Sequence, residues 1–291
     1  MVAMETIWRC REHRIACGAR TLLVGVVNVT PDSFSDGGLH LDAEAAVAHG
    51  LRLAEEGADL LDVGGESTRP GAEPVPADDE IARVVPVIER LAGRLPDMPV
   101  SVDTRKPEVA RAALAAGASI VNDVGAGTEP GMFGAVRETG AGMVLMHMRG
   151  EPRTMQAEPR YIDVVVEVTA YLRERLEVAA AAGIERERLC ADPGIGFGKD
   201  LGHNLELLRA VGRMRAALEV PLLVGPSRKR FIGSLTGADD PADRVEGTAG
   251  AVAWCAAQGA DLVRVHDVRA MRRVVQVVDA IARPKTSLEA P

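Results

Sequence analysis

Four stretches of the 291-residue chain follow one pattern of residue types, and this internal repeat constrains the fold more than any other feature. They are EEGADLLDV, AAGASIVND, ETGAGMVLM and AAQGADLVRV. In each, a helical segment ends at a glycine, which can adopt the left-handed conformation of a helix C-cap. A short apolar run follows and leads to a polar residue. Such continuous apolar runs are typical of parallel strands buried on both faces, so the repeat predicts alternating helices and parallel strands.

Extending the pattern along the chain gives eight predicted strands, with amphipathic segments such as DAEAAVAHGLRLAEE between them. The strands are expected at about residues 22–28, 59–63, 99–103, 119–122, 142–146, 188–191, 220–224 and 261–265. Eight strand–helix units in a chain of this length predict an α/β fold of the closed (β/α)₈ TIM-barrel type. The alternative is an open doubly wound sheet, which is disfavoured because no GxGxxG motif follows the first strand.

The two ends of the chain are expected to lie outside the repeated units. Residues 5–20 contain IWRC and HRIAC around a polar turn, which predicts a β-hairpin that closes the bottom of the barrel. The tail at 284–291 is expected to be disordered. The prediction is therefore a single domain over residues 1–291.

Composition narrows the class of protein. A net charge of −8 and an aromatic content of 3% argue against a nucleic-acid-binding protein, which needs a basic surface with stacking side chains. We find no apolar run that indicates a signal peptide or a membrane span, and the cysteines form no CxxC pair, so a cytoplasmic protein with reduced thiols is expected. An acidic chain that binds an anionic substrate must concentrate its cations in one pocket.

Lysine and asparagine are rare in this chain, which is rich in alanine, glycine, valine and arginine. Lysine occurs only at positions 106, 199, 229 and 285, and asparagine only at positions 28, 122 and 204. The few that remain are therefore better than average candidates for roles that no other residue type can fill.

Polar residues stand at or just after the end of each predicted strand. Because the carboxyl ends of barrel strands converge on one face, we expect these side chains to share one site. In chain order they are Asn28, Asp62, Asp103, Asn122 with Asp123, His147, Asp192, Ser227 with Arg228 and Lys229, and Arg264 with His266. Two long connections rich in glycine and proline, at 30–41 and 64–77, are expected on the same face as lids, with plain flexible loops as the alternative.

Several of these polar residues also have a structural interpretation. Asp62 is expected to organise the backbone of the VGGEST turn, and Asp123 to cap the segment after its strand. His147 could equally be a structural histidine. Lys106 precedes Pro107, which favours a surface lysine at the start of a helix.

The most specific chemical signal lies in the peptides NVTPDSFSDGG (28–38), SVDTRKP (101–107), ADPGIGFGKD (191–200) and GPSRKRFIG (225–233). Together with GGESTRPGA (64–72), IVNDVGAG (120–127) and RVHDV (264–268), they resemble the motifs of dihydropteroate synthase and occur in that family's order. The resemblance extends from about residue 7 to residue 280. It implies condensation of (7,8-dihydropterin-6-yl)methyl diphosphate with 4-aminobenzoate to give 7,8-dihydropteroate and diphosphate in folate biosynthesis.

The resemblance also implies a role for each site residue. It implies catalytic roles for Asp103, Lys229 and Asp192, which together with Asn122 would bind the pterin. The diphosphate would contact Asn28, Thr68, Arg69, Arg264 and His266, and the 4-aminobenzoate pocket would contain Phe34, Pro70, Phe197 and Ser227. Mg²⁺ would be held by the diphosphate and Asn28. The family further implies a homodimer and competition by sulfonamides for the 4-aminobenzoate pocket.

Two other functions are considered beside the synthase. A pterin-binding methyltransferase domain of the corrinoid-dependent type would share the NDV and DPG elements, but would not be expected to keep the TPDSFSDGG segment or the lysine of SRKR. A non-catalytic pterin-binding paralogue would be expected to lose principal site residues, all of which are present.

Overall fold

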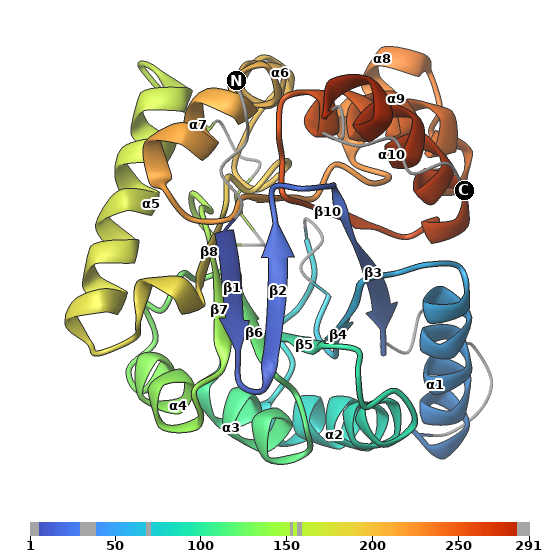
Figure 1. Ribbon diagram of the computed structural model, residues 1–291, viewed down its shortest axis with the longest axis vertical. Helices are drawn as coiled ribbons and strands as arrows, with labels where there is room; N and C mark the ends of the chain where they lie inside the picture. The colour runs from blue at the N-terminus through green and yellow to red at the C-terminus, as the bar shows by residue number, and fades with distance from the viewer. Residues whose placement is uncertain (1–5, 30–38, 68–70, 152–153, 156–158, 284–291) are drawn as a thin grey trace.

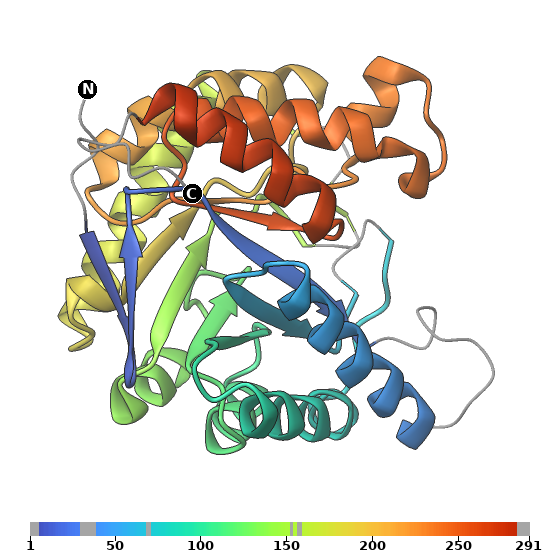
Figure 2. The same ribbon diagram turned by 45° about the vertical axis from the view of Figure 1, so that its right-hand side comes forward.

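The computed structural model describes residues 6–29, 39–67, 71–151, 154–155 and 159–283. Eight parallel strands form one sheet in the order β8-β7-β6-β5-β4-β3-β10-β9. A parallel bridge between Ala191 and Leu222 connects the two outer strands of this order and completes the barrel. Figures 1 and 2 show the helices arranged around the strands. The TIM barrel predicted from the repeat is confirmed.

The strands lie within about one residue of their predicted positions, except that β9 is shorter. They are β3 (Leu22–Asn28), β4 (Leu60–Gly64), β5 (Val100–Asp103), β6 (Ile120–Asp123), β7 (Gly142–Met146), β8 (Leu189–Asp192), β9 (Leu223–Val224) and β10 (Leu262–Val265). β9 was predicted to begin at residue 220. It begins later because Pro221 has no N–H to donate and because the N–H of Leu222 donates to the Asp261 carboxylate at 2.8 Å.

The helices form the outer layer of the barrel. They are α1 (Leu39–Glu55), α2 (Ala77–Arg94), α3 (Pro107–Ala115), α4 (Met132–Thr139), α5 (Val164–Ala181), α6 (Leu201–Arg209), α7 (Val211–Leu218), α8 (Arg230–Thr236), α9 (Val245–Ala257) and α10 (Val268–Ala282), with short 3₁₀ turns at Arg186–Arg188 and Pro241–Arg244. The four glycines of the sequence repeat have φ between +67° and +113°. This left-handed conformation is the one for which the repeat selects glycine. No helix within the described ranges is long and apolar enough to cross a membrane.

The predicted N-terminal hairpin is also confirmed. Strands β1 (Thr6–Cys10) and β2 (His13–Cys17) pair antiparallel and lie beside the barrel strands in Figure 2. Trp8, Cys10 and Cys17 pack with the first inward-facing side chains of the barrel, such as Leu22 and Ile120. Because these are the amino ends of the strands, the hairpin closes that end of the barrel with apolar side chains.

The inward-facing side chains change from apolar to polar within two residues along four strands. Residues two apart on a strand share a face, so the second of each pair lies in the layer next to the first, toward the carboxyl end. The pairs are Leu60 and Asp62 on β4, Ile120 and Asn122 on β6, Cys190 and Asp192 on β8, and Leu262 and Arg264 on β10. The barrel interior therefore consists of a closed apolar layer and a polar layer that faces the carboxyl ends.

The predicted disordered tail at 284–291 lies outside the described residues.

Candidate active site

Arg264 joins two carboxylates in the polar layer. Its Nε donates to Asp62 Oδ2 at 2.6 Å, and its Nη2 donates to Asp103 Oδ2 at 2.9 Å. Asn122 Nδ2 donates to the same Asp62 oxygen at 2.9 Å. Asp62 was expected to organise the VGGEST turn, but it holds these side chains instead, because its inward direction carries it away from the turn. Asp62 therefore sets the positions of Arg264 and Asn122.

The Asp103 carboxylate is in an unusual electrostatic environment. Its pKa is raised to about 7, chiefly by burial and also by nearby Asp62 and Glu80, while Arg264 and Lys229 oppose the rise. The Oδ1 atoms of Asp62 and Asp103 are buried and have no hydrogen-bond partner among the described residues. Unpaired buried carboxylate oxygens are costly, so these atoms are suited to receive donors from a bound molecule.

Asp192 lies at the end of β8 and is 5% exposed. Its Oδ1 accepts the N–H of Gly194 at 2.7 Å, which fixes the plane of the carboxylate. Burial raises the pKa of Asp192 to about 6, while the Gly194 N–H and the positive charges of Lys229, Lys199 and Arg264 act to lower it. At neutral pH the group is mostly ionised and accepts hydrogen bonds near the positive charges of Lys229 and Arg264.

Lys229 and Phe197 form a pair at the rim of this layer. The Lys229 ammonium lies 3.9 Å from the centroid of the Phe197 ring, which is within range of a cation–π interaction. Arg228 precedes Lys229 with φ of +58° and forms two hydrogen bonds to Asp267, at 3.0 and 2.6 Å. This strained, doubly anchored arginine fixes the direction in which the backbone presents Lys229.

Ser227 lies against His266. The Ser227 hydroxyl is 3.0 Å from His266 Nδ1, and the His266 N–H donates to that hydroxyl at 3.2 Å. The resemblance assigned these residues to different substrates, whereas the structure brings them into direct contact.

Asn28 is the last residue of β3, is half-buried and is aligned with Gly64 of β4. The predicted site residues Phe34, Thr68, Arg69 and Pro70 lie outside the described residues.

A partly buried ion-pair cluster beside the site was not predicted from the sequence. Lys106 Nζ lies 2.5 Å from Glu80 Oε2 and 3.0 Å from Glu66 Oε2. Glu80 is fully buried. Lys106 does precede α3, but the prediction of a surface lysine is wrong, because this buried carboxylate on α2 requires a cation. The rarity of lysine was the signal that could have found it.

Two predicted structural roles can be compared with the structure directly. Asp123 accepts the N–H groups of Gly125 and Gly127, each at 2.7 Å, so the predicted cap is present. His147 is buried, and burial together with the charge of Lys199 lowers its pKa to about 3. It is therefore a neutral acceptor at physiological pH, and its main-chain N–H donates to the Asp192 carbonyl at 3.0 Å.

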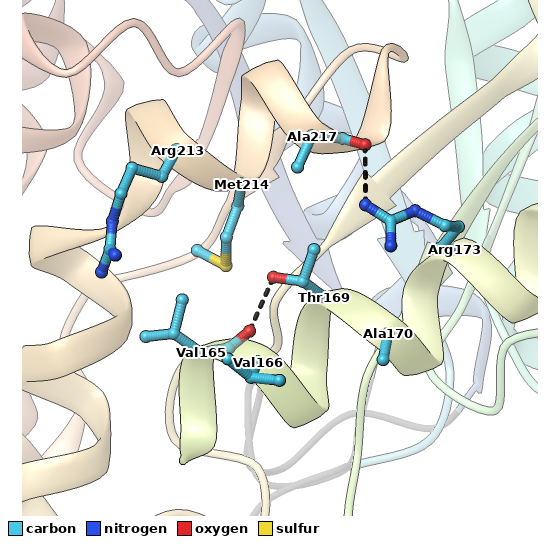
Figure 3. Close-up of a pocket in the computed structure, with 8 residues that line it drawn as sticks. All are labelled: Val165, Val166, Thr169, Ala170, Arg173, Arg213, Met214 and Ala217. Atoms are coloured by element: carbon cyan, nitrogen blue, oxygen red, sulfur yellow. Dashed lines mark hydrogen bonds between the residues drawn. The ribbon is translucent and has the colours of Figure 1, made fainter.

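A shallow groove lies elsewhere on the molecule, between α5 and α7 (Figure 3). Its volume is about 260 Å³, and it is lined by Val165, Val166, Thr169, Ala170, Arg173, Arg213, Met214 and Ala217. These residues belong to the outer helical layer. None of the predicted site residues lines the groove, so the chemistry is assigned to the polar layer of the barrel.

Comparison with known proteins gives a consistent result. The family model described as "Pterin binding enzyme" matches residues 24–266. The chain is 46% identical over 263 residues to dihydropteroate synthase of Escherichia coli strain K12, covering 90% of this chain and 92% of the relative.

Solved structures agree with these sequence matches. Xanthomonas albilineans dihydropteroate synthase with 4-aminobenzoic acid is 52% identical with a TM-score of 0.89, covering 96% of this chain and 99% of the other. A complex of the same Xanthomonas enzyme with 7,8-dihydropteroate is 49% identical with a TM-score of 0.85, covering 94% and 99%. A Yersinia pestis dihydropteroate synthase with a sulfonamide drug complex is 42% identical with a TM-score of 0.89, covering 95% and 99%.

Proposed function

The chain belongs to the dihydropteroate synthases of the pterin-binding enzyme family, and from this premise we propose how its described residues perform the reaction. That reaction joins (7,8-dihydropterin-6-yl)methyl diphosphate to 4-aminobenzoate and releases 7,8-dihydropteroate and diphosphate. The observation that carries the proposal is the polar layer at the carboxyl ends of the strands, where Asn122 and Asp192 are buried and Arg264 joins Asp62 to Asp103. A flat, polar heterocycle fits such a layer.

The pterin ring is held in this proposal by Asp192 and Asn122. A 2-amino-pyrimidinone edge presents two parallel N–H donors, which match the two oxygens of a carboxylate. Asp192 is ionised at neutral pH, and the Gly194 N–H fixes the plane of its carboxylate. The two oxygens are therefore oriented before the substrate arrives. Preorganisation of this kind reduces the cost of ordering on binding.

Bond exchange then takes place above the ring plane. The nitrogen of 4-aminobenzoate bonds to the methylene carbon as the C–O bond to the diphosphate breaks, the diphosphate leaves with that electron pair, and the amine releases one proton to solvent. Positive charge develops on the methylene carbon and the pterin, and Asp103 stabilises it from the same layer. Lys229 orients the pterin, and electrostatic preorganisation and positioning supply most of the acceleration.

The leaving diphosphate is received by cationic and polar groups from several strand ends. Arg264 lies on β10, His266 follows that strand and Asn28 ends β3, and Thr68 and Arg69 are included from the motif resemblance. This collects cations locally in an acidic chain, as an anionic substrate requires. The amine pocket is formed by Phe197 and Ser227, with Phe34 and Pro70 included from the same resemblance.

Mg²⁺ fits this donor set as a partner of the diphosphate. The described part of the chain contains no group of three or more His, Cys, Asp or Glu side chains that could hold a metal ion by themselves. Mg²⁺ commonly binds substrate phosphates with one or two protein oxygens, and the Asn28 amide at a strand end can supply one. Bound there, the ion would neutralise charge that develops on the diphosphate.

Chelation tests the metal directly. We expect excess EDTA to lower synthase activity by about tenfold or more, and Mg²⁺ to restore it, because the leaving group needs charge neutralisation. Asn28→Leu is expected to raise the Mg²⁺ concentration needed for half-maximal activity. Full activity in EDTA would exclude the metal, and an unchanged Mg²⁺ requirement in the variant would exclude Asn28 as its ligand.

The activity itself is tested with purified protein, Mg²⁺, the pterin diphosphate and 4-aminobenzoate. Diphosphate release is expected only when both substrates are present, and a sulfonamide is expected to inhibit less as 4-aminobenzoate increases, because both occupy the amine pocket. Absence of diphosphate release would refute the synthase assignment. Methyl transfer to a corrinoid protein in its place would indicate the methyltransferase.

We further propose that the protein is a cytoplasmic homodimer, as the family resemblance implies. Support for an interface comes from α9 and α10, which pack side by side. They expose Trp254, Val277 and Ile281, and the last two lie one turn apart on α10.

A further inference from the structure

One of the few lysines and one of the few asparagines lie between β8 and the middle of α6, and the reaction described above does not use them. They are Lys199 and Asn204, which are 2% and 4% exposed. A buried lysine is uncommon unless it is held by specific acceptors. Both side chains make hydrogen bonds to the loop that follows Asp192.

Lys199 connects this loop to the neighbouring one. Its ammonium donates to the carbonyl of Phe197 at 2.9 Å, to the carbonyl of His147 at 3.3 Å and to His147 Nδ1, 3.0 Å away. Because His147 is neutral, its Nδ1 can accept this bond. The amino group of Lys199, whose pKa is lowered to about 7 by burial, therefore links the β7–α5 connection with the backbone of Phe197, the residue whose ring contacts Lys229.

Asn204 holds the same loop from the side of α6. Its Oδ1 accepts the N–H of Gly196 at 2.7 Å, and its Nδ2 donates to the carbonyls of Asp200 and Lys199, at 2.6 and 3.4 Å. A side chain that uses both its acceptor and its donors within one loop specifies a single conformation of that loop.

The glycines of the loop place its backbone in close contact with its surroundings. A Cβ at Gly194 would overlap the carbonyl oxygen of His147, and one at Gly198 would overlap that of Arg149. At Gly196 a Cβ would lie 3.0 Å from Cδ of Lys229. The loop thus packs against the β7–α5 connection on one side and against Lys229 on the other, so a small shift would change the position of the lysine.

We propose that Lys199 and Asn204 form a buried brace that positions Asp192, Phe197 and Lys229 for the pterin. The inference rests on the proposed pterin site and assigns both side chains as positioning residues. Lys199 sets the distance between the two loops, and Asn204 fixes the position of Gly196 against the side chain of Lys229. Neither side chain needs to touch the substrate.

The test compares kinetics and pterin binding of Lys199→Met with those of Arg283→Met. Lys199→Met keeps the aliphatic stem and removes the ammonium. Arg283 is a matched control, because its side chain is 11% exposed and donates to the carbonyls of Ala256, Ala260 and Gly18 at the amino end of the barrel. We expect both variants to melt at lower temperature, but only Lys199→Met to lose about tenfold or more in kcat/KM for the pterin diphosphate and in calorimetric pterin affinity.

Asn204 provides a second arm that does not depend on the folding of the lysine variant. Asn204→Asp keeps the acceptor for Gly196, whereas Asn204→Leu removes it at similar size, so the aspartate variant is expected to retain more of the pterin affinity. Kinetics unchanged in a folded Lys199→Met, or equal effects of the two Asn204 variants, would overturn the brace. Failure of the wild-type protein to bind pterin would instead refute the proposed site.

Discussion

Asp192→Asn is expected to weaken pterin binding by about 10²–10³-fold while the fold survives. The substitution keeps an oxygen that can accept the Gly194 N–H, but it replaces an ionised acceptor of two N–H groups by an amide that has its own donors. Hydrogen bonds to charged groups contribute about 1.5–3 kcal/mol each, and a loss of about 3–4 kcal/mol corresponds to this change in affinity. Isothermal calorimetry with the pterin measures it.

The same substitution should not lower stability at neutral pH. The pKa of Asp192 in the folded protein is about 6, above the value of about 3.9 in an unfolded chain. Between these values the folded state binds more protons, so this group's contribution to stability falls as pH rises from about 4 to 6. The uncharged amide of the variant removes that cost, and urea unfolding at about pH 7.5 should give a free energy at least equal to that of the wild type. The advantage should disappear near pH 4, about the unfolded pKa.

Asp123→Asn is the matched control for this prediction. Asp123 is also a buried carboxylate at the end of a strand, and burial raises its pKa to about 6. It accepts two main-chain N–H groups and belongs to the cap after β6. We expect Asp123→Asn to leave pterin affinity unchanged. Equal losses in the two variants, or wild-type affinity in Asp192→Asn, would contradict the assigned role of Asp192.

Arg264→Met is expected to produce the largest loss of stability, about 3–5 kcal/mol in the free energy of unfolding at pH 8. Arg264 is the cation between Asp62 and Asp103, and its removal leaves two buried carboxylates facing one another. Activity should also be lost, because the same guanidinium is proposed to receive the diphosphate. Urea unfolding and the synthase assay measure the two effects.

The pH dependence identifies the cause of this loss. The pKa of Asp103 is already about 7 with Arg264 present, and loss of the cation raises it further. A raised carboxyl pKa in the folded state costs stability above the unfolded value, and the cost is relieved as pH falls through the folded pKa. The deficit of Arg264→Met should therefore be smaller at about pH 6 than at about pH 8, and adding Asp62→Asn should restore part of it. An equal deficit at both pH values would exclude uncompensated charge as the cause.

The fold could be predicted because its signal is local. Gly57, Gly117, Gly140 and Gly259 mark helix ends whose conformation depends on one residue, and each apolar run identifies a strand by itself. The start of β9 was missed because it depends on Asp261, a residue 39 positions away that takes the N–H of Leu222.

The site could be predicted as a set of residues but not as a set of contacts. Strand-end position placed Asp103, Asn122, Asp192 and Arg264 on one face before any resemblance was used. The partners of Asp62 lie 60 and 202 residues away, and only the barrel register brings them together. The rarity of lysine and asparagine marked Lys199 and Asn204 as unusual, but it could not show that they hold a loop.

On four barrel strands the inward-facing apolar side chain and the polar one lie two residues apart, and this spacing limits which insertions and deletions the site tolerates. Loops outside the strands can gain or lose residues without altering which side chains face inward. A single-residue insertion between Leu60 and Asp62, or between Leu262 and Arg264, would instead direct the charged side chain toward the helices and an apolar one into the site. Such an insertion is therefore expected to disrupt the site even though every site residue is still present.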